Sequence, residues 1–160
     1  MKIICLTDIN VEIPFDSLIG VTLDGLNLHR ALLEDTDLSN STLSNIDFRV
    51  AFLAQSNFTN CKFYKVSFIT AYLMGAKLIN VAMKECWARA TNFESADLSF
   101  ANLNGLDVSG ANFSNCNLKG TIMKCINIDL AEFTGAVYDG DTVWPDSFNP
   151  DNMGCIKSGV

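Results

Sequence analysis

A large apolar residue recurs at every fifth position through most of this sequence. The series runs from Leu18 to Tyr138 without an insertion or deletion, and Ala88 is its one small member. An amphipathic helix would space apolar residues three and four apart, and a half-buried strand would alternate them with polar residues. A constant spacing of five fits neither element, so we predict a backbone that turns once in every five residues.

A second series of mostly small residues lies two positions before the large one, and Ala or Cys often fills it. We expect both series to point inward, because one large and one small residue per side fill a narrow coil at normal packing density. Asn, Asp, Ser and Gly at the other positions favour turns. Four sides would close one coil, so residues 20 apart in the sequence would stack on each other. We number the sides in chain order from Leu18.

The blocks Ala96–Phe100 (ADLSF), Ala101–Gly105 (ANLNG) and Ala111–Asn115 (ANFSN) resemble the pentapeptide-repeat family of bacterial proteins. The resemblance covers about residues 16–140. It implies an all-β fold, a right-handed quadrilateral parallel β-helix of about six coils, which is a solenoid with short caps at both ends.

Both ends of the chain leave the repeat, so we expect one domain in three parts. These parts are an N-terminal cap (1–15), the β-helix (16–140) and a C-terminal cap and tail (141–160). All three prolines lie outside the coils, as expected if the repeat amides form hydrogen bonds between coils. We predict that Trp144 and Phe148 cover the last coil. The tail is similar to that of many bacterial members, often from photosynthetic bacteria.

Composition argues against several classes of function. The 18 acidic and 11 basic residues give a net charge of -7, which argues against direct nucleic-acid binding. A single histidine, His29, and the lack of a Cys-x-x-Cys pair argue against zinc sites and imidazole catalysis. Flat outer sides offer no cleft for paired carboxylates. We therefore expect no enzyme activity, no cofactor and no metal.

The N-terminus shows no signal peptide, and no apolar stretch is long enough to cross a bilayer, so we expect a cytoplasmic protein without membrane contact. The cysteines divide into two groups. Cys61, Cys86 and Cys116 take the small inward position and are predicted to pack in the core. Cys5, Cys125 and Cys155 are predicted to be accessible.

One outward column breaks the polar pattern. On the fourth side, the position before the large residue reads Leu32, Phe52 and Tyr72 before it becomes polar. Aromatic residues and arginine, with few lysines, are typical of protein interfaces. We therefore predict a candidate face for a protein partner or a second copy in a homodimer. It comprises Leu32, Phe52, Tyr72, Met74, Val50, Ile69 and all three arginines, Arg30, Arg49 and Arg89.

Several alternatives stay open at this point. The stacked apolar residues could instead only shield the coil edges. The resemblance also implies a DNA mimic, because some family members protect DNA gyrase from quinolones. Acids spread over all four sides argue against a mimic, as do the lysines gathered on the second side, which are Lys62, Lys65, Lys84 and Lys124. Trp87 either points outward, which we favour, or fills the space beside Ala88. Asn40, Asn60 and Asn80 are expected to form a hydrogen-bonded ladder.

Overall fold

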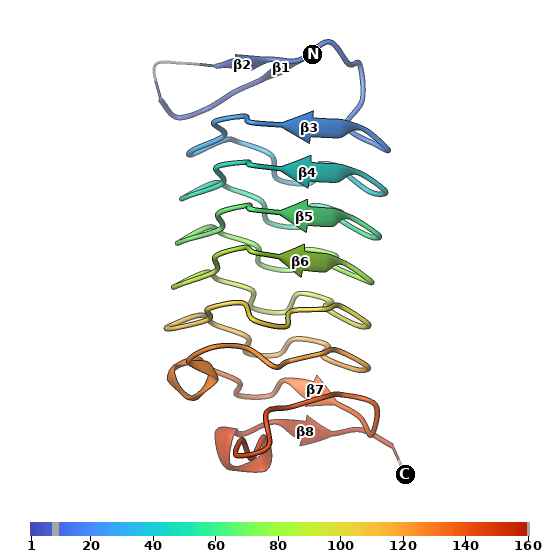
Figure 1. Ribbon diagram of the computed structural model, residues 1–160, viewed down its shortest axis with the longest axis vertical. Helices are drawn as coiled ribbons and strands as arrows, with labels where there is room; N and C mark the ends of the chain where they lie inside the picture. Colours follow the sequence, from blue (N-terminus) through green and yellow to red (C-terminus); the bar gives the residue numbers. More distant parts are fainter. Residues whose placement is uncertain (8–9, 160) are drawn as a thin grey trace.

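The computed structural model describes residues 1–7 and 10–159 and shows a stack of similar coils (Figure 1). One parallel sheet of four strands forms the second side: β3 (Thr22–Asp24), β4 (Thr42–Ser44), β5 (Lys62–Tyr64) and β6 (Ala82–Lys84). Paired residues in adjacent strands lie 20 positions apart in the sequence, as in Leu23↔Leu43 and Leu43↔Phe63. The coil length of 20 residues predicted from the repeat is therefore confirmed.

Single parallel bridges join the coils on the other sides. On the fourth side, Leu32 pairs with Phe52 and Phe52 pairs with Tyr72. The Phe52 N–H donates to the carbonyl of Ala31 at 2.9 Å, and the next N–H, that of Leu53, donates to Tyr72 at 2.8 Å. Alternate amides thus bond to the coil above and the coil below, which explains why proline is excluded from the coils.

The turns repeat as regularly as the sides. Every fifth residue from Gly20 to Gly120 has a positive φ, so each corner of the coil is a single left-handed residue. Glycine and asparagine tolerate this conformation best, and they occupy many of the corners. Between the first and second sides, Asn60 donates to Asn40 at 3.1 Å and Asn80 donates to Asn60 at 2.9 Å. The predicted asparagine ladder is confirmed.

The core is a set of columns that follow the long axis. Every member of the large series is buried, including Ala88. Phe93, Phe113 and Phe133 stack with ring centroids 4.9 and 5.2 Å apart. A buried side chain of this size contributes roughly 1.5–3 kcal/mol relative to its exposed state. The inward register of the repeat therefore accounts for most of the apolar burial.

The register of 20 first changes near residue 125. Asp107 pairs with Ile126, 19 positions further on, and the spacing returns to 20 at Asn112↔Glu132. The regular pattern puts Cys125 at a left-handed corner, but Asn127 takes that conformation instead, just before the 3-10 helix η1 (Ile128–Leu130). Asparagine tolerates positive φ better than cysteine. The prediction that Cys125 is accessible is therefore wrong: it is buried, and Ile126 is exposed.

The N-terminal cap consists of β1 (Lys2–Ile3) and β2 (Val11–Glu12), which pair antiparallel. After β1 the chain lies on the first coil, where Cys5 bridges to Ala31. This contact buries Cys5, so the prediction that it is accessible is also wrong.

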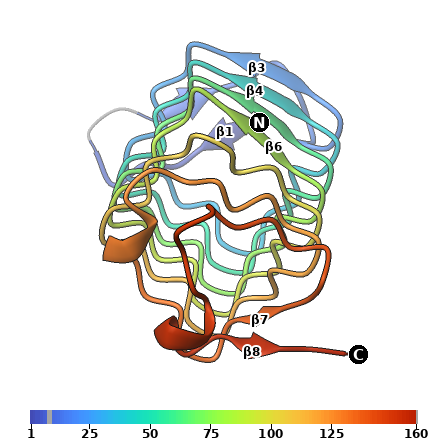
Figure 2. The same ribbon diagram turned by 60° about the horizontal axis from the view of Figure 1, so that its bottom comes forward.

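The C-terminal segment folds across the other end of the stack (Figure 2). β7 (Val137–Tyr138) pairs in parallel with β8 (Ile156–Lys157), after the 3-10 helix η2 (Asp151–Met153). The rings of Trp144 and Phe148 lie 5.8 and 5.5 Å from that of Phe133. They cover the last phenylalanine column, as predicted.

Candidate functional site

The fourth side carries a column of outward apolar side chains. The Phe52 and Tyr72 rings stack at 5.2 Å with an interplanar angle of 17°. Tyr72 is 41% exposed, Leu32 is 37% exposed and Phe52 is half-buried between them. The residues do shield one another, as the alternative interpretation predicts, but the outer surface of the column stays open to solvent.

The N-terminal chain extends this column, which the sequence reasoning missed. The amide of Leu32 donates to the carbonyl of Ile4 at 2.8 Å, and the amide of Leu6 donates to that of Arg30 at 2.9 Å. Ile4 is 44% exposed and Leu6 is 49% exposed. We call Ile4, Leu32, Phe52 and Tyr72 the apolar column. The sequence carries no signal for this, because Ile3, Ile4, Cys5 and Leu6 are all apolar and only the structure separates buried Ile3 and Cys5 from exposed Ile4 and Leu6.

The corner beside the apolar column has an unusual composition. Val50 and Thr70 occupy its left-handed positions, with φ of 57° and 56°. β-Branched residues are outliers in this conformation, because the branched Cβ crowds the backbone. Holding a residue in such a conformation lowers the stability of the fold by about 1–3 kcal/mol. The equivalent positions two corners away are Asn40, Asn60 and Asn80, and within residues 1–7 and 10–159 no other left-handed position carries a β-branched residue.

The three arginines differ in how firmly they are held. Arg49 pairs with Asp47 on the third side, with Nη2 and Oδ2 2.7 Å apart. Burial would raise the pKa of Asp47, but the hydrogen bonds and charge of Arg49 hold it below its usual value. Arg89 lies 4.0 Å from Asp107. Arg30, at the corner between the third and fourth sides, has no ion-pair partner among residues 1–7 and 10–159.

Trp87 lies on the third side and is 45% exposed, so the predicted outward orientation is confirmed. It lines a shallow hollow of about 470 Å³ together with Arg49, Ser67 and Ile69. The candidate face therefore has two parts. Leu32, Phe52, Tyr72 and Met74 lie on the fourth side and Arg49, Ile69 and Arg89 on the third, with Arg30 and Val50 at the corner between them.

The inward cysteines are not activated as nucleophiles. Burial raises the pKa of the Cys61 and Cys86 thiols to about 11 and that of Cys116 to about 12. These thiols stay protonated at neutral pH, whereas the thiolate is the nucleophile. Within the part of the chain that the structure describes, no cluster of His, Cys, Asp or Glu could hold a metal ion.

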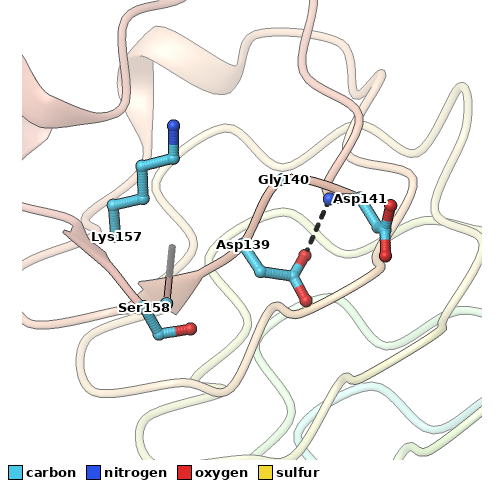
Figure 3. A pocket seen from close by; sticks show the side chains of 6 residues that line it. Asp139, Gly140, Asp141, Lys157 and Ser158 are labelled. Atoms are coloured by element: carbon cyan, nitrogen blue, oxygen red, sulfur yellow. Dashed lines mark hydrogen bonds between the residues drawn. The ribbon is translucent and has the colours of Figure 1, made fainter.

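A second hollow lies at the C-terminal end, between Asp139–Asp141 and Lys157–Gly159 (Figure 3). The Asp139 carboxylate accepts hydrogen bonds from the amides of Gly120 and Asp141, at 3.0 and 3.1 Å, and from the Thr142 hydroxyl. The Gly120 bond is the main cause of the lowered pKa of Asp139. This carboxylate therefore holds the turn that borders the hollow.

No helix in residues 1–7 and 10–159 combines the length and apolar character needed to cross a bilayer.

The family described as Pentapeptide repeats matches in eight copies, over residues 17–49, 51–87, 71–115, 89–127 and 111–137. A search of curated proteins gave no significant match.

Solved structures with a similar fold include a pentapeptide repeat protein from Nostoc PCC 7120. It is 25% identical over 70% of this chain and 84% of that chain, with a TM-score of 0.41. A pentapeptide repeat protein from the cyanobacterium Cyanothece 51142 is 22% identical over 79% and 89% of the two chains, with a TM-score of 0.36. QnrB1, a plasmid-mediated fluoroquinolone resistance protein, is 15% identical over 87% and 81%, with a TM-score of 0.40.

Proposed function

The chain belongs to the pentapeptide repeat family, and on that premise we propose that it is a non-enzymatic interaction module that binds a protein through the candidate face. The observation that carries the proposal is the strained corner at Val50 and Thr70 beside the exposed apolar column. Strain of this kind persists where the surroundings hold it in place, and it clusters at functional sites. Asparagine at both positions would relieve the strain but would remove apolar surface from the corner.

The composition of the fourth side supports a protein as the partner. Apolar and aromatic side chains occupy its middle, and residues 31–35, 51–55 and 71–75 contain no lysine. Interface cores are enriched in aromatic residues and methionine and depleted in lysine. Tyr72 and Met74, each 41% exposed, present adjacent side chains of these types.

We further propose that the coils wind in the right-handed sense that the resemblance implies, and that about six of them form the stack. A column of parallel pairs supports this number. It runs along the second side from Thr22 through Thr42, Lys62, Ala82, Asn102 and Ile122 to Val143.

The charges favour this function over a DNA mimic that binds gyrase. A mimic needs a continuous acidic stripe, but the second side is lysine-rich. There Lys65 and Lys84 lie 5.0 and 5.9 Å from the centre of the Tyr64 ring. On the fourth side, Glu34 and Asp35 of the first coil are separated from Glu94 of the fourth coil by Phe52 and Tyr72, so these acids do not form a continuous stripe.

Site-specific photo-crosslinking in cells that express the protein tests the proposal. Benzoylphenylalanine replaces Phe52 in one sample and Ile79, a half-buried outward residue of the first side, in the control. We expect a covalent protein adduct at position 52 and none at position 79. Adducts of equal yield at both positions, or no adduct at position 52, would overturn the proposal.

A further inference from the structure

The fourth side is divided lengthwise into three strips. Its leading edge is the corner that it shares with the third side. This edge carries Arg30 at the corner of the first coil, and Arg89 lies next to the corner of the fourth coil. The apolar column runs along the middle. The trailing edge is the corner toward the first side of the next coil, and it carries Glu34 and Asp35 in the first coil and Glu94 in the fourth. Positive charge therefore lies along one edge and negative charge along the other. Arg49, which holds the position of Arg89 in the second coil, is paired with Asp47 on the third side.

These charges are available for contact. Arg30, Glu34 and Asp35 are exposed and Glu94 is half-buried. None of these four residues forms an ion pair in the described ranges 1–7 and 10–159. Arg89 has only the 4.0 Å contact with Asp107, and its side chain is 61% exposed.

Two-fold symmetry makes this pattern complementary to itself. A two-fold axis parallel to the stack exchanges the two edges and keeps each level unchanged. Arg30 of one copy then meets Glu34 and Asp35 of the other, Arg89 meets Glu94, and the apolar column meets itself. A two-fold axis across the stack would place arginine edge on arginine edge, and like charges in contact suppress that pairing. Two-fold dimers with such isologous contacts are the commonest oligomers.

We propose that the partner bound by the candidate face is a second copy of this chain, docked fourth side to fourth side with the two stacks parallel. This inference rests on the proposed function and adds the identity and orientation of the partner. Asn92 and Asn112 continue the middle strip, and an amide pairs with its own copy because it both donates and accepts. Glu132, at the end of that strip, meets its own copy and limits the contact to the first five coils.

The contact is small, so the dimer is weak. Five coils at about 4.8 Å spacing span only about 20–24 Å. Stable interfaces bury about 800 Å² on each partner. We therefore expect a dissociation constant in the micromolar range or weaker, and the measurement must extend to about 1 mM.

A charge-swap experiment by sedimentation velocity tests the arrangement. One variant carries Arg30→Glu, and the second carries Glu34→Arg with Asp35→Asn. Each change suits its backbone, because Glu85 and Asn45 hold left-handed corners elsewhere, and Arg49 occupies the position after the large residue on the third side. Lys62→Glu, on the second side, is the control. Circular dichroism checks that every variant is folded.

We expect wild type and the Lys62→Glu control to have the same dimer dissociation constant. For each swap variant alone, the dissociation constant should be at least about tenfold higher than for wild type. An equimolar mixture of the two swap variants should form dimers again, because the altered edges then match. Wild type that stays monomeric up to about 1 mM, or a mixture that stays monomeric, overturns the inference. A crosslink at position 52 to a different protein also overturns it but supports the proposed function, whereas the absence of any crosslink there overturns both.

Discussion

Val50 and Thr70 lie on consecutive coils at the same corner, 20 residues apart, and both hold a left-handed backbone conformation that β-branched residues rarely adopt. The Val50 amide donates to the carbonyl of Ile69, immediately before Thr70, at 3.2 Å. Hydrogen bonds between coils therefore hold the two residues in this conformation. The strained corner lies beside the exposed apolar column, so a substitution there should change both the stability of the fold and the binding of the proposed partner.

Replacing Val50 with Asn should stabilise the protein. Asparagine tolerates the left-handed conformation, so the free energy of unfolding should rise by about 1 kcal/mol. For a chain of this size, this corresponds to an increase in Tm of roughly 2–4 °C. Differential scanning calorimetry measures the shift, with Asn115→Val, at another left-handed corner, as the reverse control, which should lower Tm. A fall in Tm for Val50→Asn would show that Val50 is not strained.

The same Val50→Asn variant should bind its partner less well, because it removes apolar surface beside Phe52. Stability and association should therefore change in opposite directions. A variant that is more stable and associates as well as wild type would mean that the strained corner has no part in binding.

An inward and an outward phenylalanine should respond differently to the same substitution. Phe63 is 2% exposed, and its ring packs against Phe58 and Phe68 at 5.6 and 5.2 Å. Phe63→Asp would place an unpaired charge in the core, so we expect a loss of more than about 4 kcal/mol and no folded product. Phe52→Asp should leave the far-ultraviolet circular dichroism unchanged and lower stability by about 1 kcal/mol or less. A folded Phe63→Asp protein would contradict the inward register.

The spacing of five was sufficient to predict which side chains form the core, because a single register places Phe63 inside and Phe52 outside. It failed near Cys125 because both Cys125 and Ile126 are apolar, and the preference of Asn127 for positive φ decides which one turns inward. It also missed Ile4 and Leu6, since their position depends on a contact with Leu32 and Arg30 that no local period encodes. For the site, the sequence indicated Leu32, Phe52, Tyr72 and the arginines. The separation of the charges into two edges depends on where the corners lie.

Acid should destabilise the protein through the carboxylates that shape its sides. The amide of Ser39 donates to Asp37 at 2.8 Å and lowers the pKa of Asp37. The Ser109 hydroxyl and amide lower the pKa of Asp107 in the same way. A carboxyl whose pKa is lower in the folded state stabilises the fold above its unfolded pKa, near 3.9, and loses that contribution as pH falls through the folded pKa. Stability should therefore decline below about pH 4.

The Asp37→Asn, Asp107→Asn double variant tests this assignment. Asparagine keeps the acceptor, as shown by Asn57, whose Oδ1 accepts from the Thr59 amide at 3.1 Å. The variant cannot titrate at these positions, so urea unfolding between pH 2 and pH 5 should show a shallower pH dependence than wild type. An unchanged slope would show that other carboxyl groups dominate the acid response.

Thiol labelling should separate the cysteines by burial. Cys5, Cys61, Cys86, Cys116 and Cys125 are buried, and Cys155 is half-buried in the tail. Burial raises the pKa of Cys125 to about 12 and that of Cys155 to about 11, so even Cys155 should react slowly with Ellman's reagent at pH 8. We expect one slow thiol in the native protein, none in the Cys155→Ser variant, and all six in wild type after unfolding in guanidinium chloride. Rapid native labelling at Cys125 would mean that the chain keeps the regular register there, with Cys125 at an exposed corner instead of inside the coil.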